Sequence, residues 1–148
     1  MDAMDPKTAQ QVWNRVAAAP APGLSPGDLH SLIVPAVETA ALYRSLASSL
    51  SGKQKETALL LAIAQQDTVF ALRGMQQLSF GKRGSFKSAP APRQKAQQLL
   101  EACYRRARTA LTEYTARTIH AEYGPAFRQL AAREEEHCIK ILSLLGQL

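Results

Sequence analysis

The segment "LAAREEEHCIKILSLLGQL", residues 130–148, places three glutamates and a histidine inside a pattern of apolar residues at helical spacing. At about 100° per residue, Glu134 falls at the centre of the apolar stripe, and His137, three residues later, shares that face. Glu135 falls near the edge of the stripe, and Glu136 falls on the solvent side. The segment therefore predicts a helix that carries one carboxylate and one imidazole into a core.

A second helical segment repeats this pattern without the charges. Residues 61–75, "LAIAQQDTVFALRGM", align with the start of the quoted segment and place Gln65 and Thr68 at the positions of its inward glutamate and histidine. Tyr43 and Tyr114 fall on the apolar faces of two further helical segments. The sequence thus predicts polar side chains from several helices at one depth of a core.

The inward carboxylate of this group needs partners, because burial of an unpaired charge is costly. We expect a neighbouring imidazole, amide or tyrosine hydroxyl to hydrogen-bond it. The predicted buried polar cluster consists of Tyr43, Gln65, Thr68, Tyr114, Glu134 and His137.

Length and composition are those of a single helical domain. The 148 residues are 46% hydrophobic, and Gly and Pro are concentrated in a few breaks that separate long stretches of helix-forming residues. These stretches cover about 29–50, 53–78, 94–121 and the residues after Gly124–Pro125. The pattern predicts an all-α four-helix bundle at 28–148, made of two antiparallel helical hairpins. A long basic crossover at 79–93 joins the hairpins, and a short extra N-terminal helix with a Pro-rich linker occupies 1–27.

The motif Ala131-x-x-Glu134-Glu135-x-His137, its uncharged echo Ala62-x-x-Gln65-Gln66-x-Thr68, the two tyrosines and the long crossover occur together in this chain. In these features residues 29–148 resemble a ferritin-like bundle of the rubrerythrin type. The resemblance implies a core site at which one Glu from each of two helices and a Glu-x-x-His motif from each of the other two hold a pair of iron or manganese ions.

Carried over position by position, only Glu134 and His137 match such a site. The second motif has become an amide and a hydroxyl, and Ala36 and Ala107 stand where the single glutamates would be. One carboxylate and one imidazole supply too little negative charge for two transition-metal ions. The resemblance therefore implies a degenerate di-iron site, with Glu134 and His137 as the candidate metal ligands.

These observations favour a non-catalytic bundle with a binding, structural or regulatory role and no resident cofactor. The alternative is a rubrerythrin-like metalloprotein with oxidase or peroxidase-like activity, which holds one iron, manganese or zinc ion, or a pair through ligands outside this register. A small-ligand pocket in the space left by the alanines is a further alternative. Enzymatic activity is left open, and its absence is favoured.

The remaining features bear on partners and location. The net charge of +6 permits contact with polyanions, but the basic crossover is interpreted as a connector rather than as a nucleic-acid site. No apolar run is long enough to span a membrane and no secretory signal is evident, so we expect a cytoplasmic protein. Cys103 and Cys138 are expected to be reduced structural thiols. A homodimer is expected.

Overall fold

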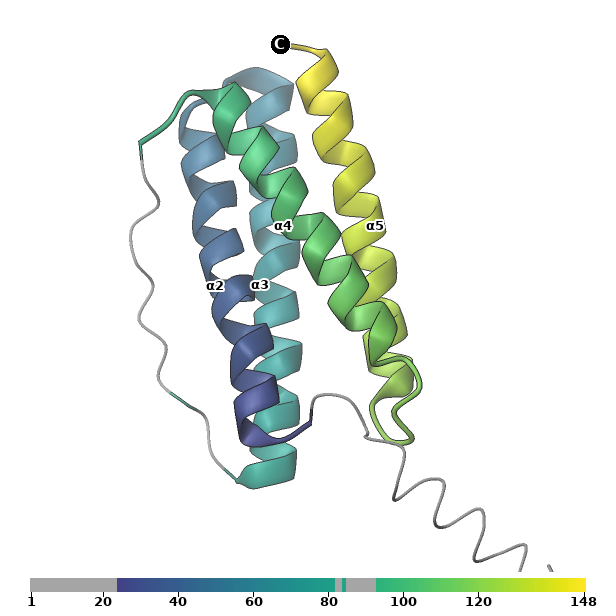
Figure 1. Ribbon diagram of the computed structural model, residues 1–148. Coiled ribbons are helices and arrows are strands. Elements are labelled where there is room, and N and C mark those ends of the chain that lie inside the picture. The colour runs from purple at the N-terminus through teal and green to yellow at the C-terminus, as the bar shows by residue number, and fades with distance from the viewer. Residues whose placement is uncertain (1–23, 82–83, 85–92) are drawn as a thin grey trace, which may run out of the picture.

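The computed structural model describes residues 24–81, 84 and 93–148, and these residues form four helices and no strand. The helices are α2 (Pro26–Ser48), α3 (Gly52–Phe80), α4 (Ala96–Ala116) and α5 (Gly124–Gly146). The predicted all-α architecture of two hairpins with a crossover is confirmed (Figure 1). The predicted N-terminal helix and most of the predicted crossover lie outside the described residues.

Local sequence signals explain where the helices begin and end. The Ser25 hydroxyl accepts a hydrogen bond from the Asp28 backbone N–H at 3.1 Å, and the Asp28 carboxylate accepts one from the Ser25 N–H at 3.3 Å. This reciprocal pair caps α2, and Pro26 follows it at the first helical position. Gly81 ends α3 with a φ of 68°, a left-handed conformation that glycine adopts without strain.

The third predicted helix was expected to continue to about residue 121, and this is wrong, because α4 ends at Ala116. The Arg117 side chain turns back to the preceding turn and donates to the Glu113 backbone carbonyl at 2.8 Å. The chain then folds so tightly that a Cβ at Gly124 would lie 2.5 Å from the Thr118 carbonyl oxygen. Glycine is therefore required where α5 begins.

The four helices form a bundle with a definite neighbour order. Within the hairpins α2 packs along α3 and α4 packs along α5, and between the hairpins α2 contacts α4 more extensively than α3 contacts α5. Figure 1 shows α4 crossing the front of the bundle obliquely, close to α2 near its N-terminal end and further from it toward its C-terminal end. The two hairpins are therefore splayed at one end of the bundle.

Two apolar cores fill the interior, one toward each end. The first core includes Tyr43, Leu46, Leu61, Leu99, Leu100, Cys103, Ala107, Cys138 and Ile141. The second core includes Leu29, Leu32, Ile33, Val69, Leu72, Tyr114, Phe127 and Leu130. In α3 and α5 the residues of the predicted polar cluster fall between the stretches that supply these two cores. The polar cluster is thus a layer at the middle of the bundle.

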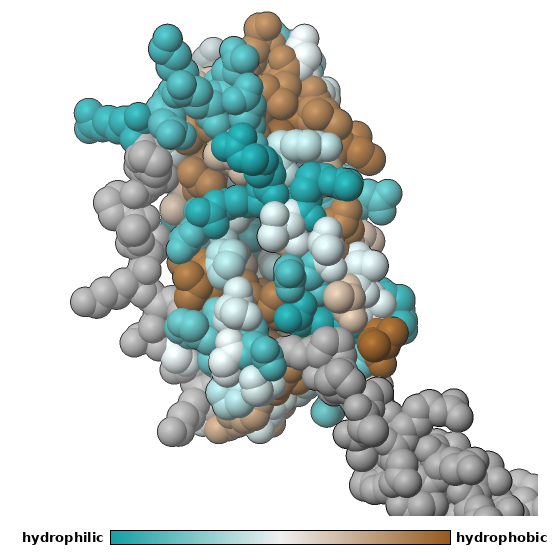
Figure 2. Space-filling view, viewed as in Figure 1, coloured by the Kyte–Doolittle hydropathy of each residue, from teal (hydrophilic) through white to brown (hydrophobic). Residues whose placement is uncertain are grey.

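None of the described helices combines the length and the apolar character that a bilayer-spanning segment needs. Figure 2 shows hydrophilic side chains over much of one face and hydrophobic side chains toward the C-terminal end of α5. Leu142 and Leu148 in this part of the chain are exposed.

Candidate functional site

The structure buries every residue of the predicted polar cluster. Glu134 is 1% exposed and His137 is 2% exposed, on the inner face of α5. Gln65 and Thr68 are buried on α3, and the two tyrosines are buried on α2 and α4. The rings of Tyr43 and His137 meet edge to face with their centroids 5.8 Å apart. Four helices therefore contribute polar groups to the central layer.

The two polar side chains of α3 bond to groups outside the predicted cluster. The Gln65 amide donates from Nε2 to the Ala36 carbonyl on α2 at 3.2 Å. The Thr68 hydroxyl donates to the Ala64 carbonyl at 3.4 Å and accepts from the Arg133 guanidinium at 2.9 Å. Sequence analysis missed Arg133. The available signal was its place beside Glu134 at the edge of the stripe, from which a long side chain can reach across to the next helix.

Glu134 does not form the hydrogen bonds that were expected for it. Neither of its carboxyl oxygens has a hydrogen-bond partner among the described residues, and the same holds for Gln65 Oε1, Tyr43 Oη and His137 Nδ1. The separation of Glu134 Oε2 and His137 Nδ1 is 3.7 Å, which is too long for a hydrogen bond. Because these two side chains project side by side from one helix, they lie close together without pointing at each other.

Burial sets the protonation of the layer. It raises the pKa of Glu134 to about 8, against a smaller lowering by the Arg133 charge, so this carboxyl is mostly protonated at neutral pH. It also lowers the pKa of His137 to about 4, so the imidazole is neutral. Burial likewise raises the pKa of Tyr43. The central layer is therefore uncharged near neutral pH, and the adjacent glutamate and histidine are not an ion pair.

A cavity of about 460 Å³ reaches this layer from the side, between α2 and α4. Its inner end is formed by Gln65, Tyr114 and Glu134, which come from three different helices. Leu32, Pro35, Ala36 and Ala110 supply apolar walls. The residues of α4 that line the cavity lie between 105 and 114, and Figure 1 shows this part of α4 running away from α2.

The space predicted beside the alanines is partly where it was expected. Ala36 lines the cavity, whereas Ala107 is fully buried in the first core and the α4 wall is formed by Ala110 instead. The difference arises because the cavity is lined by one face of α4, at residues 105, 106, 109, 110, 113 and 114, and Ala107 lies on another face of the helix.

Charged side chains of α4 lie at the cavity's outer end. Arg106 forms an ion pair with Glu38 of α2 at 2.9 Å, and Glu113 forms one with Arg117 at 2.8 Å. Arg105 also lines the cavity and is exposed, and it forms no ion pair with any residue in the described ranges. Among the described charged residues at the mouth, Arg105 is therefore the cation without an ion-pair partner.

The donor set in the layer does not fit a dinuclear metal centre. Across the described part of the chain, no three His, Cys, Asp or Glu side chains come together as a cation site would require. Glu134 and His137 are the only acid and imidazole of the predicted cluster, and an amide and neutral hydroxyls complete it. Two divalent cations would be left largely without charge compensation.

The two cysteines have no part in the cavity. Cys103 and Cys138 are free, buried thiols in the first core. Burial raises the pKa of Cys103 to about 12, which suppresses its reactive thiolate form.

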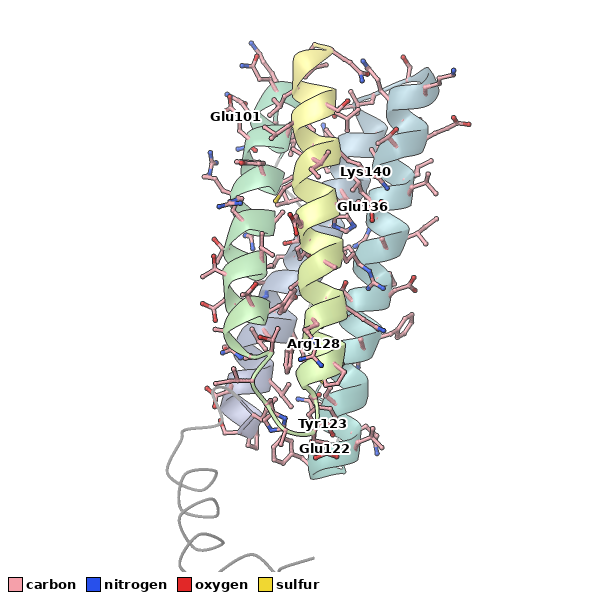
Figure 3. All side chains as sticks on the ribbon, turned by 90° about the vertical axis from the view of Figure 1, so that its right-hand side faces the viewer. Glu101, Glu122, Tyr123, Arg128, Glu136 and Lys140 are labelled. Atoms are coloured by element: carbon pink, nitrogen blue, oxygen red, sulfur yellow. The ribbon has the colours of Figure 1, made fainter. Side chains whose placement is uncertain are left out.

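The outer face of α5 carries an ordinary surface contact, an exposed ion pair between Glu136 and Lys140 at 2.9 Å (Figure 3).

Comparison of the chain with protein-family models, with curated proteins and with solved structures finds no match. The four-helix architecture and the cavity are therefore the observations from which a function can be inferred.

Proposed function

We propose that this protein is a non-catalytic, ferritin-like helical bundle that binds a small molecule in the cavity between α2 and α4. In this proposal an uncharged polar layer stands where ferritin-like bundles hold two metal ions. The observation that carries the proposal is the inner end of the cavity, where the Glu134 carboxyl and Gln65 Oε1 are buried and have no hydrogen-bond partner in residues 24–81, 84 and 93–148.

Unsatisfied buried polar atoms favour a bound partner. A buried acceptor or donor without a hydrogen bond costs about 1–3 kcal/mol, and a ligand that reaches it can recover part of that free energy. The cavity volume of about 460 Å³ falls within the range typical of small-molecule sites, and its exposed lining is mainly apolar, with polar groups at both ends. These are the ordinary features of a ligand pocket.

The proposal is tested by screening a library of small fragments against the full chain by ligand-observed NMR. Ala110→Leu places a larger side chain in the cavity wall, and Ala102→Leu is a matched control at a partly buried alanine of α4 outside the cavity. We expect saturable binders that are lost in Ala110→Leu and retained in Ala102→Leu. Absence of any saturable binder, or equal binding to both variants, would refute the proposal.

One observation favours the metalloprotein as a second candidate. Glu134 Oε2 and His137 Nδ1 are 3.7 Å apart and neither is hydrogen-bonded within the described residues, so the pair offers two ligand atoms to a single ion. Metal analysis of protein purified without chelator separates the candidates. Near-stoichiometric iron, manganese or zinc that is lost in His137→Ala would replace the first proposal with this one.

The predicted homodimer and the absence of nucleic-acid binding stay predictions. Exposed apolar side chains on α3 and α5, among them Leu60, Ile63 and Ile139, give the dimer a surface that can be tested. Sedimentation velocity of the unmodified chain and of Ile63→Glu measures whether a dimer forms and whether it uses this face.

A further inference from the structure

The cavity has chemically different ends, and the inner end presents acceptors in a fixed arrangement. The Ala36 carbonyl can only accept a hydrogen bond, so the Gln65 atom beside it must be the NH₂ group. This contact fixes the amide orientation and leaves Oε1 as an acceptor that no residue of the described ranges satisfies. The Glu134 carboxyl also lines this end, and neither of its oxygens has a hydrogen-bond partner among the described residues. A ligand needs at least one N–H or O–H donor to satisfy this end.

The middle of the cavity offers little to a polar ligand. Leu32, Pro35, Ala36 and Ala110 have no side-chain hydrogen-bonding atoms. The Thr39 hydroxyl donates to the Pro35 carbonyl at 2.7 Å, and the Ser31 hydroxyl donates to the Asp28 carbonyl at 2.6 Å, so the donors of these wall residues are already used. The body of a ligand that fits here is apolar.

The outer end favours negative charge. Two ion pairs there are complete within the protein, because Glu38 is paired with Arg106 and Glu113 is paired with Arg117. Arg105 remains, with its guanidinium able to donate two parallel hydrogen bonds to a carboxylate. A cationic ligand would instead meet an unbalanced positive charge at the entrance.

We propose that the cavity binds an amphipathic organic acid, whose carboxylate contacts Arg105, whose body lies against the apolar walls, and whose far end carries a hydroxyl or amide N–H that donates to Gln65 Oε1. This inference rests on the proposed binding function and specifies its ligand class. An ammonium group at the inner end is disfavoured because removing its charge from water costs several kcal/mol.

The ligand class is tested by titration calorimetry of the full chain with four probes of one length: ω-hydroxyoctanoate, octanoate, ω-aminooctanoate and octanediol. The hydroxy acid should bind tightest. Octanoate should bind about 10-fold more weakly, because it leaves the buried acceptor unpaired. Octanediol should bind about 3-fold more weakly, since an exposed ion pair contributes little. ω-Aminooctanoate should bind more weakly than octanoate.

Two variants assign these preferences to single residues. Gln65→Met keeps the length of the side chain but removes the acceptor, so the preference for hydroxyoctanoate over octanoate should disappear; Gln66→Met is the control. Arg105→Gln should remove the preference for the hydroxy acid over the diol, and Arg108→Gln is the control, an exposed arginine of α4 outside the cavity. Each readout is a ratio of two affinities for one variant, so a general loss of stability does not imitate it.

The outcomes separate this inference from the function on which it rests. Equal binding of hydroxyoctanoate and octanoate, or a ratio unchanged in Gln65→Met, overturns the ligand class while fragment binding at the cavity still supports the binding function. Binding of hydroxyoctanoate that is unchanged in Ala110→Leu places the probe elsewhere and also overturns the inference. Failure of the probes together with the fragments refutes both.

Discussion

The two cores of this bundle differ in how α4 takes part in them. In the first core α4 buries Leu99, Leu100, Cys103 and Ala107 against the other helices. In the second core its only fully buried side chain is Tyr114, and the small Ala110 lines a cavity in place of a filled interface. The same four helices thus make a closed interior at one end and a ligand-sized space at the other.

The largest expected effect is on the closed end. Leu100→Ala should lower the free energy of unfolding by about 3 kcal/mol, because a fully buried leucine is lost and a new cavity is left behind. Leu32→Ala should cost about half as much, since one side of Leu32 already faces the existing cavity and lacks partner atoms there. Urea denaturation of both variants measures the difference. Equal losses would show that the second end is packed as closely as the first.

A second prediction concerns pH and the polar layer. Glu134 has a pKa of about 8 against an ordinary 4.5, so the folded state binds more protons between these values and the free energy of unfolding falls as pH rises through that window. His137, with a pKa of about 4 against 6.5, gives the opposite slope between pH 4 and 6.5. The contributions of Glu134 and His137 to the pH dependence of the free energy of unfolding therefore oppose each other up to pH 6.5. Between pH 6.5 and 8 only the contribution of Glu134 remains of these two.

Over that upper window we expect a fall in the free energy of unfolding of about 1–2 kcal/mol. Glu134→Gln should abolish the fall and be as stable as the unmodified protein or more so at pH 8, because it keeps the side-chain shape without an ionisable group. Glu135→Gln, on the exposed side of the same helix, should leave the fall intact. Urea denaturation at several pH values provides the measurement. A profile that stays level from 6.5 to 8 in the unmodified chain would mean that Glu134 is already ionised at neutral pH.

A smaller effect is expected from the contact that sequence analysis missed. Arg133→Met keeps an aliphatic stem but removes the 2.9 Å hydrogen bond to Thr68, which should cost about 1 kcal/mol. Since the Arg133 charge also lowers the pKa of Glu134, its removal should shift the pH-dependent fall to higher pH. Denaturation over the same pH range tests both effects. A loss of stability with no change in the pH of the fall would show that the hydrogen bond stabilises the fold but that the Arg133 charge does not lower the pKa of Glu134.

The smallest effect is expected at the outer surface of α5. Lys140→Gln breaks the exposed ion pair with Glu136, and such pairs contribute little because solvent and salt screen them (Figure 3). The urea midpoint should not move measurably, and neither should probe binding at the cavity. A clear shift in either would contradict the view that the buried layer and the cavity dominate the behaviour of this bundle.

Helical periodicity was sufficient to find the polar residues of the central layer. Centring the apolar stripes identified Gln65, Thr68, Glu134 and His137, because the face that a helix buries follows from about 100° per residue and little else. The same reasoning failed at the end of α4, where a side-chain contact from Arg117 and a close backbone approach at Gly124 decide the boundary.

The interior of the site could not be predicted to the same degree. Whether Glu134 is hydrogen-bonded depends on the side-chain rotamers in the layer and on which groups Gln65 and Thr68 bond to instead. That Ala110 rather than Ala107 lines the cavity depends on which face α4 turns toward α2. Both are properties of interhelical geometry, which a pattern of residue types along one chain does not specify.

The chain carries its cysteines, Cys103 and Cys138, in the first core and places none in the described part of the second. Thiol-exchange kinetics in the native state will therefore time the opening of the closed end alone. If occupation of the distant cavity slows that labelling, the bundle opens as one cooperative unit. If the labelling rate does not change, the end of the bundle that contains the second core opens independently of the first. The two native cysteines therefore distinguish cooperative from independent opening without any mutation.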